Sequence, residues 1–504
     1  MTILKDLLRQ IEYKVIQGSM DAEVSSISYD SRLCKKDTLF VCVYGFITDG
    51  HEYIPQAVEK GATAILVQES VWETKAYDLG NSSQKSLTVV VVKDTRKALS
   101  LVSAAFFKNP TGRLNLLGIT GTKGKTTSTY MVREILRASG KNVGLLGTNN
   151  NIVGGEISPS KNTTPESYDL QKMLSEMLEK GDDSCVMEVS SQGLMLDRVE
   201  GCTFSVAAFT NFYKDHIGEH EHASMAEYLN WKLHIFDMAK IAVINADCSV
   251  ADEVISFAEK KVEKLYLYGL DTSYDISASK LEKKKKNGTI GTAFFLKSPW
   301  YEGEVFVGMP SEFNVYNALC AIAIAGINHI PFSCVKKALE EMKVPGRLQV
   351  VPYDGDFDVL VDYAHNAASL EQLLKSLREY TKGSLITVFG CGGNRAKDRR
   401  YEMGEVSGGL SDMTIITSDN PRKEEPMEII KDILTGIEPT GGAFIVEEDR
   451  ERAIEKAIQM AKKGDVVVIA GKGHENYQIF KDRTIHFDDA ETAEKIIKNG
   501  TEGK

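Results

Sequence analysis

The feature that most constrains this 504-residue chain is a glycine-containing loop between an apolar run and a helix-like segment. Residues 114–119 form a mainly apolar run, as in a buried parallel strand, and residues 120–127 read TGTKGKTT. A helix is predicted over about 126–139, ended by Gly140, and a second strand over 143–146. Strand, loop, helix and strand in this order indicate a βαβ unit of a doubly wound, mostly parallel sheet.

The same loop carries the groups that bind phosphate. Glycines let backbone N–H groups point at phosphate oxygens, and the N-terminus of the following helix adds a partial positive charge. Lys125 can neutralise charge on the β- and γ-phosphates, and the Thr126 hydroxyl can ligate Mg²⁺. The strict P-loop pattern has a glycine where this chain has Ile119, so the match is partial. A plain strand-to-helix turn is the alternative, and the buried strand before the loop and the GKTT run at its end argue against it.

Turn signals and a repeated strand–helix pattern divide the chain into three α/β regions. Interruptions at 109–112 and 345–346 predict domains at residues 1–109, 110–344 and 345–504. Residues 265–310 alternate and turn, and four lysines precede Asn287 and Gly288, which predicts a solvated β-hairpin. Buried strands are predicted at 38–43, 64–67, 87–92, 184–188, 206–210, 241–245, 359–363, 385–389, 413–417 and 466–470, with a helix at 54–60.

The overall composition excludes several classes of protein. The formal net charge of -11 argues against a nucleic-acid partner, which needs a basic surface. No apolar run reaches the ~18 residues of a membrane span, and the charges within residues 1–10 predict a short amphipathic helix and not a signal peptide. The 8 cysteines include no C-x-x-C pair, as expected for reduced thiols in the cytosol. We therefore expect a cytoplasmic protein that binds neither nucleic acid nor a membrane.

Two further clusters follow predicted strands of the central region. The first is EVSSQ at 188–192, in which Glu188 could hold a metal ion, although an acid at a strand end is more often a helix cap or a solvated group. The second contains Asp215, His216 and, on a predicted helix, Lys232. His216 could be a metal ligand, but a lone histidine is commonly structural, and a lysine among apolar neighbours commonly extends to solvent. Taken singly, these residues do not establish a site.

Taken together, the motifs resemble the central domain of the Mur ligase family. Their order is Gly-Thr-x-Gly-Lys-Thr-Thr in the loop, Asn-Thr-Thr-Pro at 162–165, Glu-Val-Ser-Ser at 188–191, Asp-His at 215–216, and then a helical lysine. The similarity extends over the whole chain and is greatest to the branch that adds the third amino acid of the cell-wall peptide. It implies an N-terminal α/β substrate domain, a central P-loop ATPase-like domain with a parallel sheet, and a C-terminal Rossmann-like domain.

The resemblance also implies a reaction. Members of this branch use ATP to convert the D-glutamyl γ-carboxylate of UDP-N-acetylmuramoyl-L-alanyl-D-glutamate into an acyl phosphate. The amine of meso-diaminopimelate then attacks the acyl phosphate, and phosphate leaves. Closure of the third domain would align the amine and exclude water. The expected setting is cytoplasmic peptidoglycan precursor synthesis, and the expected state is a monomer.

The resemblance assigns the ATP and metal site residue by residue. Lys232 is expected to react with CO₂, giving a carbamate that helps hold a second Mg²⁺ with His216, while Thr126 and Glu188 hold the first. Carbamylation turns a cation into a carboxylate-like oxygen ligand, which suits Mg²⁺. Two asparagines of the adenine-side signature would, taken alone, be helix caps. The expected catalytic residues are Lys125, His216, Lys232, Arg347 and Asp362. The expected ATP-binding residues are Gly121, Thr122, Lys123, Gly124, Lys125, Thr126, Thr127, Asn314 and Asn317.

The resemblance likewise assigns the other two substrates. A D-N-P-R motif containing Arg422 indicates meso-diaminopimelate, since an arginine can bind its free carboxylate bidentately, although alone the motif is an ordinary turn. Leu196 replaces a glutamine contact that is usual in relatives. The residues expected to hold the muramoyl dipeptide nucleotide are Ser31, Phe46, Ile47, Thr48, Asn162, Thr163, Thr164, Ser190 and Arg198. Those expected to hold the amino acid are Arg395, Asp419, Asn420, Pro421, Arg422, Gly471 and Glu475.

Departures from the family pattern leave alternatives open. Lys123, Asn366, Ala367 and Asn394 stand where relatives usually have other residues, which would suit a paralogue that uses L-lysine, another diamine or a different glutamyl substrate. A non-catalytic or regulatory nucleotide-binding protein is a second alternative, and the intact set of loop lysine, acid, histidine and helical lysine argues against it. A stand-alone P-loop ATPase is opposed by the lack of a separate Walker B acid run.

Overall fold

The computed structural model describes residues 1–45, 48–72, 87–215, 217–218, 221–287, 289–353 and 355–502. The chain divides into two compact units. Both contain parallel sheets and helices, and none of the described helices is long and apolar enough to cross a membrane. The first unit comprises residues 1–269, 274–276 and 320–331, and the second comprises residues 270–273, 277–319 and 332–504. The predicted boundaries after residues 109 and 344 stay predictions.

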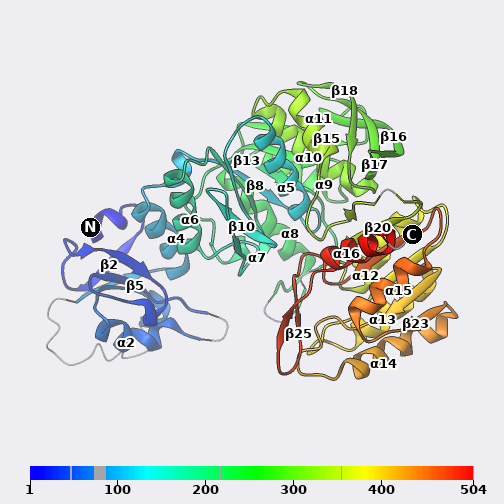
Figure 1. Ribbon diagram of the computed structural model, residues 1–504. Coiled ribbons are helices and arrows are strands. Elements are labelled where there is room, and N and C mark those ends of the chain that lie inside the picture. Colours follow the sequence, from blue (N-terminus) through cyan, green and yellow to red (C-terminus); the bar gives the residue numbers. More distant parts are fainter. Residues whose placement is uncertain are drawn as a thin grey trace. The chain divides into compact units, whose positions relative to one another are not determined.

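A five-stranded sheet forms the N-terminal part of the first unit (Figure 1). Its order is β2-β7-β6-β5-β4, with β4 to β7 parallel and β2 antiparallel at one edge. Strands β5 and β7 are buried along their whole length, as predicted for apolar runs in a parallel sheet. The elements are β2 Tyr13–Gln17, β4 Ser26–Ser28, β5 Thr38–Val41, α2 Ile54–Glu59, β6 Ala62–Gln68, α3 Glu69–Trp72, β7 Thr88–Val92 and α4 Thr95–Phe106.

The first residues of the chain differ in part from the amphipathic helix predicted there. Strand β1, Thr2–Ile3, pairs with β3, Glu23–Val24, and only α1, Leu4–Leu7, is helical. Leucines of this short helix, together with Leu8, are buried in the core of the sheet. The predicted short amphipathic helix is confirmed at residues 4–7, where the leucines are buried and Lys5 and Asp6 are exposed. It is shorter than the predicted stretch because residues 2–3 pair with a distant strand, which no local pattern reveals.

A larger sheet follows and carries the glycine loop. Within the first unit its strands lie in the order β11-β10-β9-β12-β8-β13-β14-β15, and the run from β9 to β15 is parallel. The predicted strands, loop and helices are therefore confirmed as elements here. They are β8 Asn115–Thr120, α5 Lys125–Ala138, β9 Val143–Leu146, β10 Asn150–Val153, β11 Glu156–Pro159, α6 Ser167–Glu179, β12 Ser184–Glu188, α7 Ser191–Met195, β13 Phe204–Phe209, α8 Met225–Leu233, β14 Ala239–Asn245, α9 Ala251–Ala258 and β15 Lys264–Gly269.

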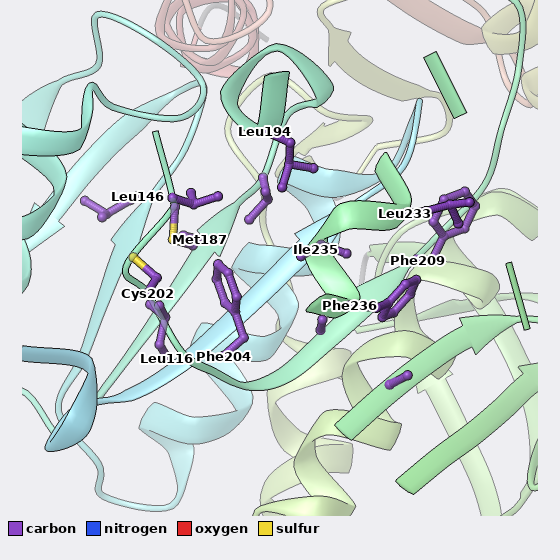
Figure 2. Packing of buried hydrophobic residues seen from close by; sticks show 14 of the residues in the cluster. Leu116, Leu146, Met187, Leu194, Cys202, Phe204, Phe209, Leu233, Ile235 and Phe236 are labelled. Atoms are coloured by element: carbon purple, nitrogen blue, oxygen red, sulfur yellow. The ribbon is translucent and has the colours of Figure 1, made fainter. Parts of the chain in front are cut away.

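Apolar side chains from several of these elements pack into one core (Figure 2). Leu116 of β8, Met187 of β12 and Phe204 of β13 lie in it with Ile235 and Phe236, and all five are fully buried. Burying a side chain of this size stabilises the fold by about 1.5–3 kcal/mol. Because side chains alternate along a strand, this burial fixes the register of the three strands.

The register sets the carboxyl ends of the central strands side by side. Glu188, which ends β12, pairs with Ile119 of β8, and Phe209, which ends β13, pairs with Thr120. The loops that follow these three strands therefore meet at one edge of the sheet. This is the edge at which open α/β sheets bind ligands.

Strands β16 to β18 lie almost wholly in the second unit. β16, Ile276–Lys286, pairs with β17, Thr289–Lys297, which pairs in turn with β18, Glu302–Val307, all antiparallel. This confirms the predicted hairpin, whose Gly288 lies outside the described residues. Its lysines are exposed, as expected, but they also form ion pairs that the sequence did not predict. The pairs are Lys283 with Glu379, Lys285 with Asp358 and Lys286 with Glu340.

The C-terminal sheet has the order β19-β20-β24-β21-β22-β23. Within this sheet the run β20-β24-β21-β22-β23 is parallel and β19 is antiparallel at one edge. Strand β24 lies between β20 and β21, so the chain order reverses there. Ligands bind at the carboxyl ends of strands next to such a reversal. The elements are α10 Glu312–Ile327, α11 Phe332–Glu340, β19 Gln349–Val351, β20 Asp358–Asp362, α12 Ala367–Arg378, β21 Leu385–Phe389, α13 Asp398–Leu410, β22 Met413–Ile416, α14 Pro426–Ile437, β23 Phe444–Val446, α15 Arg450–Met460, β24 Val466–Ala470, β25 Tyr477–Ile479, β26 Thr484–His486 and α16 Asp489–Glu502.

Candidate active site

The glycine loop runs from the end of β8 to the start of α5. Gly121 has a φ of 140°, and a Cβ there would lie 2.0 Å from Thr210 Oγ1. Gly124, with a φ of 83°, directly precedes the helix. A larger residue would be strained at both positions, and the lack of a side chain at Gly121 lets the backbone pass close to the residues that follow β13.

Side chains that follow β13 hold the loop in shape. The Lys123 backbone N–H donates to Asn211 Oδ1 at 2.8 Å, and the Thr210 hydroxyl donates to the Lys123 carbonyl at 2.7 Å. The Lys123 ammonium lies 3.3 Å from Asp215 Oδ2. Thr210 ends the strand predicted at 206–210, and the sequence analysis gave neither it nor Asn211 a role. Their contacts depend on β8 and β13 being neighbours, which local sequence does not show.

Two lysines converge on one carbonyl of the loop. Lys125 Nζ donates to the Gly121 carbonyl at 2.9 Å and to the Thr122 carbonyl at 3.1 Å. Lys232 Nζ donates to the same Gly121 oxygen at 2.9 Å. The two nitrogens therefore lie close together, and two full positive charges would repel each other there.

Lys232 is the more deeply buried of the two lysines. It lies in the last turn of α8, is 1 % exposed, and its Nζ lies 4.6 Å from the centre of the Tyr228 ring. Burial and the nearby charge of Lys125 lower the pKa of Lys232 well below its ordinary value, and Asp215 opposes this only in part. The reading of Lys232 as a lysine that extends to solvent was wrong, because its side chain is buried against Tyr228 and the glycine loop.

The ring of Tyr228 packs against the Lys232 side chain. Its hydroxyl donates to Thr122 Oγ1 at 3.2 Å, and its ring lies 5.1 Å from the ring of His222. His222 Nε2 lies 2.9 Å from Ser191 Oγ. The sequence analysis gave none of these side chains a role, although a tyrosine four residues before Lys232 places both on one face of the helix.

Glu188 faces the start of α5 from the end of β12. The Thr126 hydroxyl donates to Glu188 Oε1 at 3.0 Å, and Thr148 donates through its backbone N–H to Oε1 at 2.7 Å and through its hydroxyl to Oε2 at 3.1 Å. The carboxylate is 1 % exposed, and none of the ion pairs among the described residues involves it. A buried carboxylate with only neutral partners suits a divalent cation, and the Thr126 hydroxyl is an oxygen ligand beside it. His216 lies outside the described residues.

The residues predicted to hold the muramoyl dipeptide fall into two places. Thr164 accepts from the Ser190 backbone N–H at 2.9 Å, and its carbonyl accepts from Arg198 at 3.1 Å. Thr163 Oγ1 lies 3.0 Å from Thr148 Oγ1, so these residues adjoin Glu188. Asn162 lies in the same loop and its carbonyl accepts from Ser160. Ser31 and Thr48 lie in the N-terminal sheet region, where Ser31 donates to Gln56 at 2.6 Å, and Phe46 and Ile47 lie outside the described residues.

The predicted adenine-side asparagines lie at the start of α10, in the second unit. Asn314 donates to the Pro310 carbonyl at 2.7 Å, and Asn317 donates to Asn314 Oδ1 at 3.1 Å. Both are buried. Asn314 thus ties the first turn of the helix to the residues before it. Both asparagines lie inside α10, and Asn314 donates here where a cap residue would accept from a backbone N–H, so this contact does not support the simpler reading as helix caps. A nucleotide role stays a prediction.

Arg347 and Asp362 meet at the end of β20. Asp362 accepts from the backbone N–H groups of Leu348 at 2.8 Å and Ala364 at 2.9 Å, and its burial raises its pKa although Arg347 opposes this. The Arg347 guanidinium lies 5.0 Å from the centre of the Tyr363 ring, and that ring lies 4.9 Å from the ring of His474. Burial and Arg347 lower the pKa of His474 to about 4. Asp362 therefore holds the 346–348 turn against the strand.

The residues predicted to bind the amino-acid substrate, apart from Arg395, lie in the loops that follow β22 and β24. Asn420 Nδ2 donates to Glu475 Oε2 at 2.8 Å, and Arg422 donates to the Gly393 carbonyl at 2.8 Å. Gly471 has a φ of 113°, and a Cβ there would meet Asp419 Oδ2 at 2.9 Å, so the two loops approach closely. Asp419, Asn420, Pro421, Arg422, Gly471 and Glu475 form one cluster through these contacts, whereas Arg395 is exposed on the preceding loop.

A buried ion pair adjoins this cluster, and the sequence analysis did not predict it. Arg450 donates to Asp489 through Nε at 2.7 Å and through a terminal nitrogen at 2.8 Å, and both side chains are fully buried. Arg450 also donates to the carbonyls of Ser418 and Ala470, which precede the two loops. Its bidentate geometry ties the ends of β22 and β24 together.

Comparison with known proteins agrees with this arrangement. The chain matches the profiles described as Mur ligase family, catalytic domain, over residues 23–107, Mur ligase middle domain over 119–325, and Mur ligase, glutamate ligase domain, over 346–473. A UDP-N-acetylmuramoyl-L-alanyl-D-glutamate–2,6-diaminopimelate ligase of Clostridium botulinum is 43% identical over 495 residues, covering 98% of this chain and 99% of that protein. A ligase of the same name, numbered 1, from Clostridium acetobutylicum is 44% identical over 498 residues, with 98% and 99% covered. The chain belongs to the Mur ligase family.

Solved structures show the same fold. A structure of a UDP-N-acetylmuramoyl-L-alanyl-D-glutamate–2,6-diaminopimelate ligase has a TM-score of 0.72 at 27% identity and covers 99% of this chain and 100% of its own. The MurF ligase of Thermotoga maritima, solved with ADP, has a TM-score of 0.58 at 17% identity, covering 95% and 99%, and shows the fold alone. These comparisons confirm the resemblance to Mur ligases and the three-domain α/β class. They also confirm the enzyme class, an ATP-dependent ligase.

Proposed function

We propose that this enzyme uses ATP to join meso-diaminopimelate to UDP-N-acetylmuramoyl-L-alanyl-D-glutamate, as the names of its relatives state for those proteins. The D-glutamyl γ-carboxylate attacks the γ-phosphorus of ATP, ADP leaves, and an acyl phosphate forms. The amine then attacks the acyl carbon, phosphate leaves, and the amine nitrogen loses a proton. The observation that carries the proposal is the convergence of Lys125 and Lys232 on the Gly121 carbonyl, beside the Thr126–Glu188 contact.

The phosphate loop would lower the main barrier of the first step, which is repulsion between two anions. Backbone N–H groups of residues 121–127 and the N-terminus of α5 favour phosphate oxygens. Lys125 now donates to two loop carbonyls, and it can exchange these for phosphate oxygens without leaving the loop. Preorganised donors of this kind stabilise the transferring phosphoryl group.

The donor set fits Mg²⁺ and a carbamate. We propose that Thr126 and Glu188 hold one Mg²⁺, and that Lys232 as a carbamate and His216 hold another. When bound, Mg²⁺ supplies positive charge to the phosphate oxygens. The Thr126 hydroxyl and the Glu188 carboxylate lie together as oxygen ligands, and a carbamate on Lys232 would supply a further carboxylate-like oxygen.

The surroundings of Lys232 favour its carbamylation. A neutral amine is the form that attacks CO₂, and burial lowers the pKa of this lysine. The Lys232 nitrogen forms a bond to the carbon of CO₂ and releases one proton to solvent. The product is anionic, so it would turn the repulsion between Lys232 and Lys125 into attraction.

The amino-acid end would lie at the cluster that follows β22 and β24. Arg422 can bind a carboxylate bidentately, and Glu475 can receive an ammonium. Together they suit a zwitterionic end such as that of meso-diaminopimelate. Arg395, Asp419, Asn420, Pro421 and Gly471 complete this site in the proposal, and Arg347 and Asp362 keep catalytic roles that stay predictions.

Further parts of the proposal rest on the family. The muramoyl dipeptide would contact Thr163, Thr164, Ser190 and Arg198, with Ser31 at the nucleotide. The ATP-binding set, the domain division after residues 109 and 344, a monomeric state and a cytoplasmic location are proposed on the same basis. None of them requires a membrane or a nucleic acid.

A substrate panel tests the proposed function. Phosphate release is measured with ATP, Mg²⁺ and the dipeptide nucleotide, together with meso-diaminopimelate, L-lysine or another diamine in turn. We expect release only when the nucleotide and meso-diaminopimelate are both present. Release with L-lysine but not with meso-diaminopimelate would show that the enzyme is a ligase with a different amino-acid acceptor. Release that depends on neither the nucleotide nor an amino acid would overturn the proposal.

A further inference from the structure

A second buried lysine, Lys472, lies in the C-terminal sheet and has no role in the proposal so far. It is the second residue after β24, and its side chain is 0 % exposed. Its ammonium donates to the Tyr477 carbonyl and to Asn420 Oδ1, the latter at 3.4 Å, and it lies 3.5 Å from Glu475 Oε2. A lysine is almost never fully buried unless it is paired, so these contacts account for its position.

These contacts fix the orientation of the Asn420 side chain. Asn420 Oδ1 accepts from the Ile479 backbone N–H at 2.9 Å as well as from Lys472. A carboxamide has one acceptor end and one donor end, so its Nδ2 must turn toward Glu475, to whose Oε2 it donates at 2.8 Å. With the amide reversed, its N–H₂ group would face two donors. Lys472 and the Ile479 N–H therefore act together to set which end of Asn420 meets Glu475.

The same lysine also sets the charge around Glu475. Arg450 is engaged with Asp489 by two hydrogen bonds, at 2.7 Å and 2.8 Å. Lys472 interacts electrostatically with both Asp419 and Glu475, as Arg450 also does. With Asp489 counted, three carboxylates and two cations leave one negative charge apart from Arg422, and this charge favours a positively charged group on a ligand.

We propose that Lys472 is a positioning residue for the amino-acid substrate: through Asn420 it holds Glu475 so that one carboxylate oxygen is engaged and the other faces the substrate ammonium. Among the described residues, the hydrogen bonds and ion pair of Glu475 all go to Oε2. The proposal rests on the proposed function, because it requires that this cluster binds the amino acid. It adds a residue that would not touch the substrate itself.

The first test replaces the ammonium and keeps the length of the side chain. In Lys472→Met, the KM for meso-diaminopimelate should rise about 10- to 100-fold, because a buried carboxylate loses a charged partner. The KM values for ATP and the dipeptide nucleotide should stay within about twofold, which also shows that the protein is folded. Lys463→Met is the matched control, since that lysine lies in the same region with a side chain that is 84% exposed. An unchanged KM for the amino acid in Lys472→Met would overturn the proposal.

The second test separates positioning from a general loss of stability. If Lys472 acts through Glu475, then Lys472→Met should add less than about twofold to the KM of the Glu475→Gln variant. Effects that multiply would contradict this coupling. Should Lys472→Met fail to fold, Lys472→Gln, which keeps a donor for the Tyr477 carbonyl, carries the same two measurements. Wild-type enzyme that is inactive with every amino acid would refute the proposed function, whereas active wild type with an unaffected Lys472→Met would refute the positioning role alone.

Discussion

The two buried lysines of this enzyme, Lys232 and Lys472, have the same side chain and nearly the same burial but different surroundings. Lys232 faces a carbonyl, the ring of Tyr228 and a second cation, Lys125. Lys472 faces a carbonyl and an amide oxygen and has the carboxylates of Asp419 and Glu475 nearby. Each lies beyond the carboxyl ends of parallel strands, where ligands bind.

The difference shows that burial alone does not decide what a lysine does. Burial lowers the pKa of both lysines. At Lys472 the nearby carboxylates oppose this shift, whereas at Lys232 the positive charge of Lys125 adds to it. Lys232 is therefore suited to react as a neutral amine, and Lys472 is suited to remain a cation that orders its neighbours. The predictions below test these two roles.

The largest effect is expected at Lys232. Lys232→Ala removes the proposed carbamate, and kcat should fall by about a thousandfold or more, as for loss of a group that stabilises phosphoryl transfer. A short carboxylic acid added to the assay should restore part of the activity, because it can replace the carboxylate. Lys240→Ala, an exposed position on β14, is the control and should be near wild type. Full activity in Lys232→Ala would refute the proposed role of Lys232 as a carbamate.

A smaller but still large effect is expected at Glu188. Glu188→Gln keeps the shape and removes the charge, so kcat should fall about a hundredfold and the Mg²⁺ concentration for half-maximal rate should rise. Initial rates over a Mg²⁺ series measure both. Glu156→Gln, whose side chain is 79% exposed, is the control. If the Mg²⁺ requirement of Glu188→Gln matches wild type, Glu188 is not a metal ligand.

Arg422 tests the side of the comparison that contains Lys472. Arg422→Ala should raise the KM for meso-diaminopimelate about 10- to 100-fold, because a bidentate contact to a carboxylate is lost. Any slow turnover of L-lysine, which lacks that carboxylate, should change far less. Arg483→Ala, with a side chain 62% exposed, provides the control. Equal effects on both amino acids would show that Arg422 does not select between them.

The smallest effect concerns stability and His474. Its pKa is lowered from 6.5 to about 4 by burial and by Arg347, so the folded protein favours the neutral ring. Between these pH values the unfolded chain binds a proton at this histidine that the folded protein does not bind. The free energy of unfolding therefore falls as the pH falls through this range, and the stabilisation is fully present above pH 6.5. Denaturant unfolding should therefore show a steeper loss from pH 6.5 to 4.5 in wild type than in His474→Gln. His329→Asn, at an exposed position, should follow wild type, and identical slopes in all three proteins would refute the assignment.

Much of the fold could be predicted because the central strands are apolar runs ended by turns. The strands at 143–146, 184–188, 385–389 and 466–470 have the predicted bounds, and others differ by one to a few residues. The N-terminal helix is shorter than the predicted stretch because β1 pairs with β3, and such pairing has no local signature. The three α/β regions followed from turn signals and the repeated strand–helix pattern, and the family followed from the order of motifs.

The site was predictable only where a short motif carries the chemistry. The loop and Glu188 follow strands whose ends must meet, so their proximity could be expected. Thr148 and Tyr228 were given no role, and neither was Lys472, although it stands between the predicted residues Gly471 and Glu475. The contacts of all three depend on which strands are neighbours. The burial of Lys232 could not be predicted either, because a lysine on an amphipathic helix is usually solvated.

The most direct test of the account compares the two lysines in one measurement. Wild type, Lys232→Ala and Lys472→Met, each as full-length enzyme, are equilibrated with ¹³C-bicarbonate, and carbonyl signals bound to protein are recorded by ¹³C NMR. The account predicts one protein carbamate signal in wild type, its retention in Lys472→Met and its loss in Lys232→Ala. A signal that persists in Lys232→Ala, or that disappears in Lys472→Met, would contradict it.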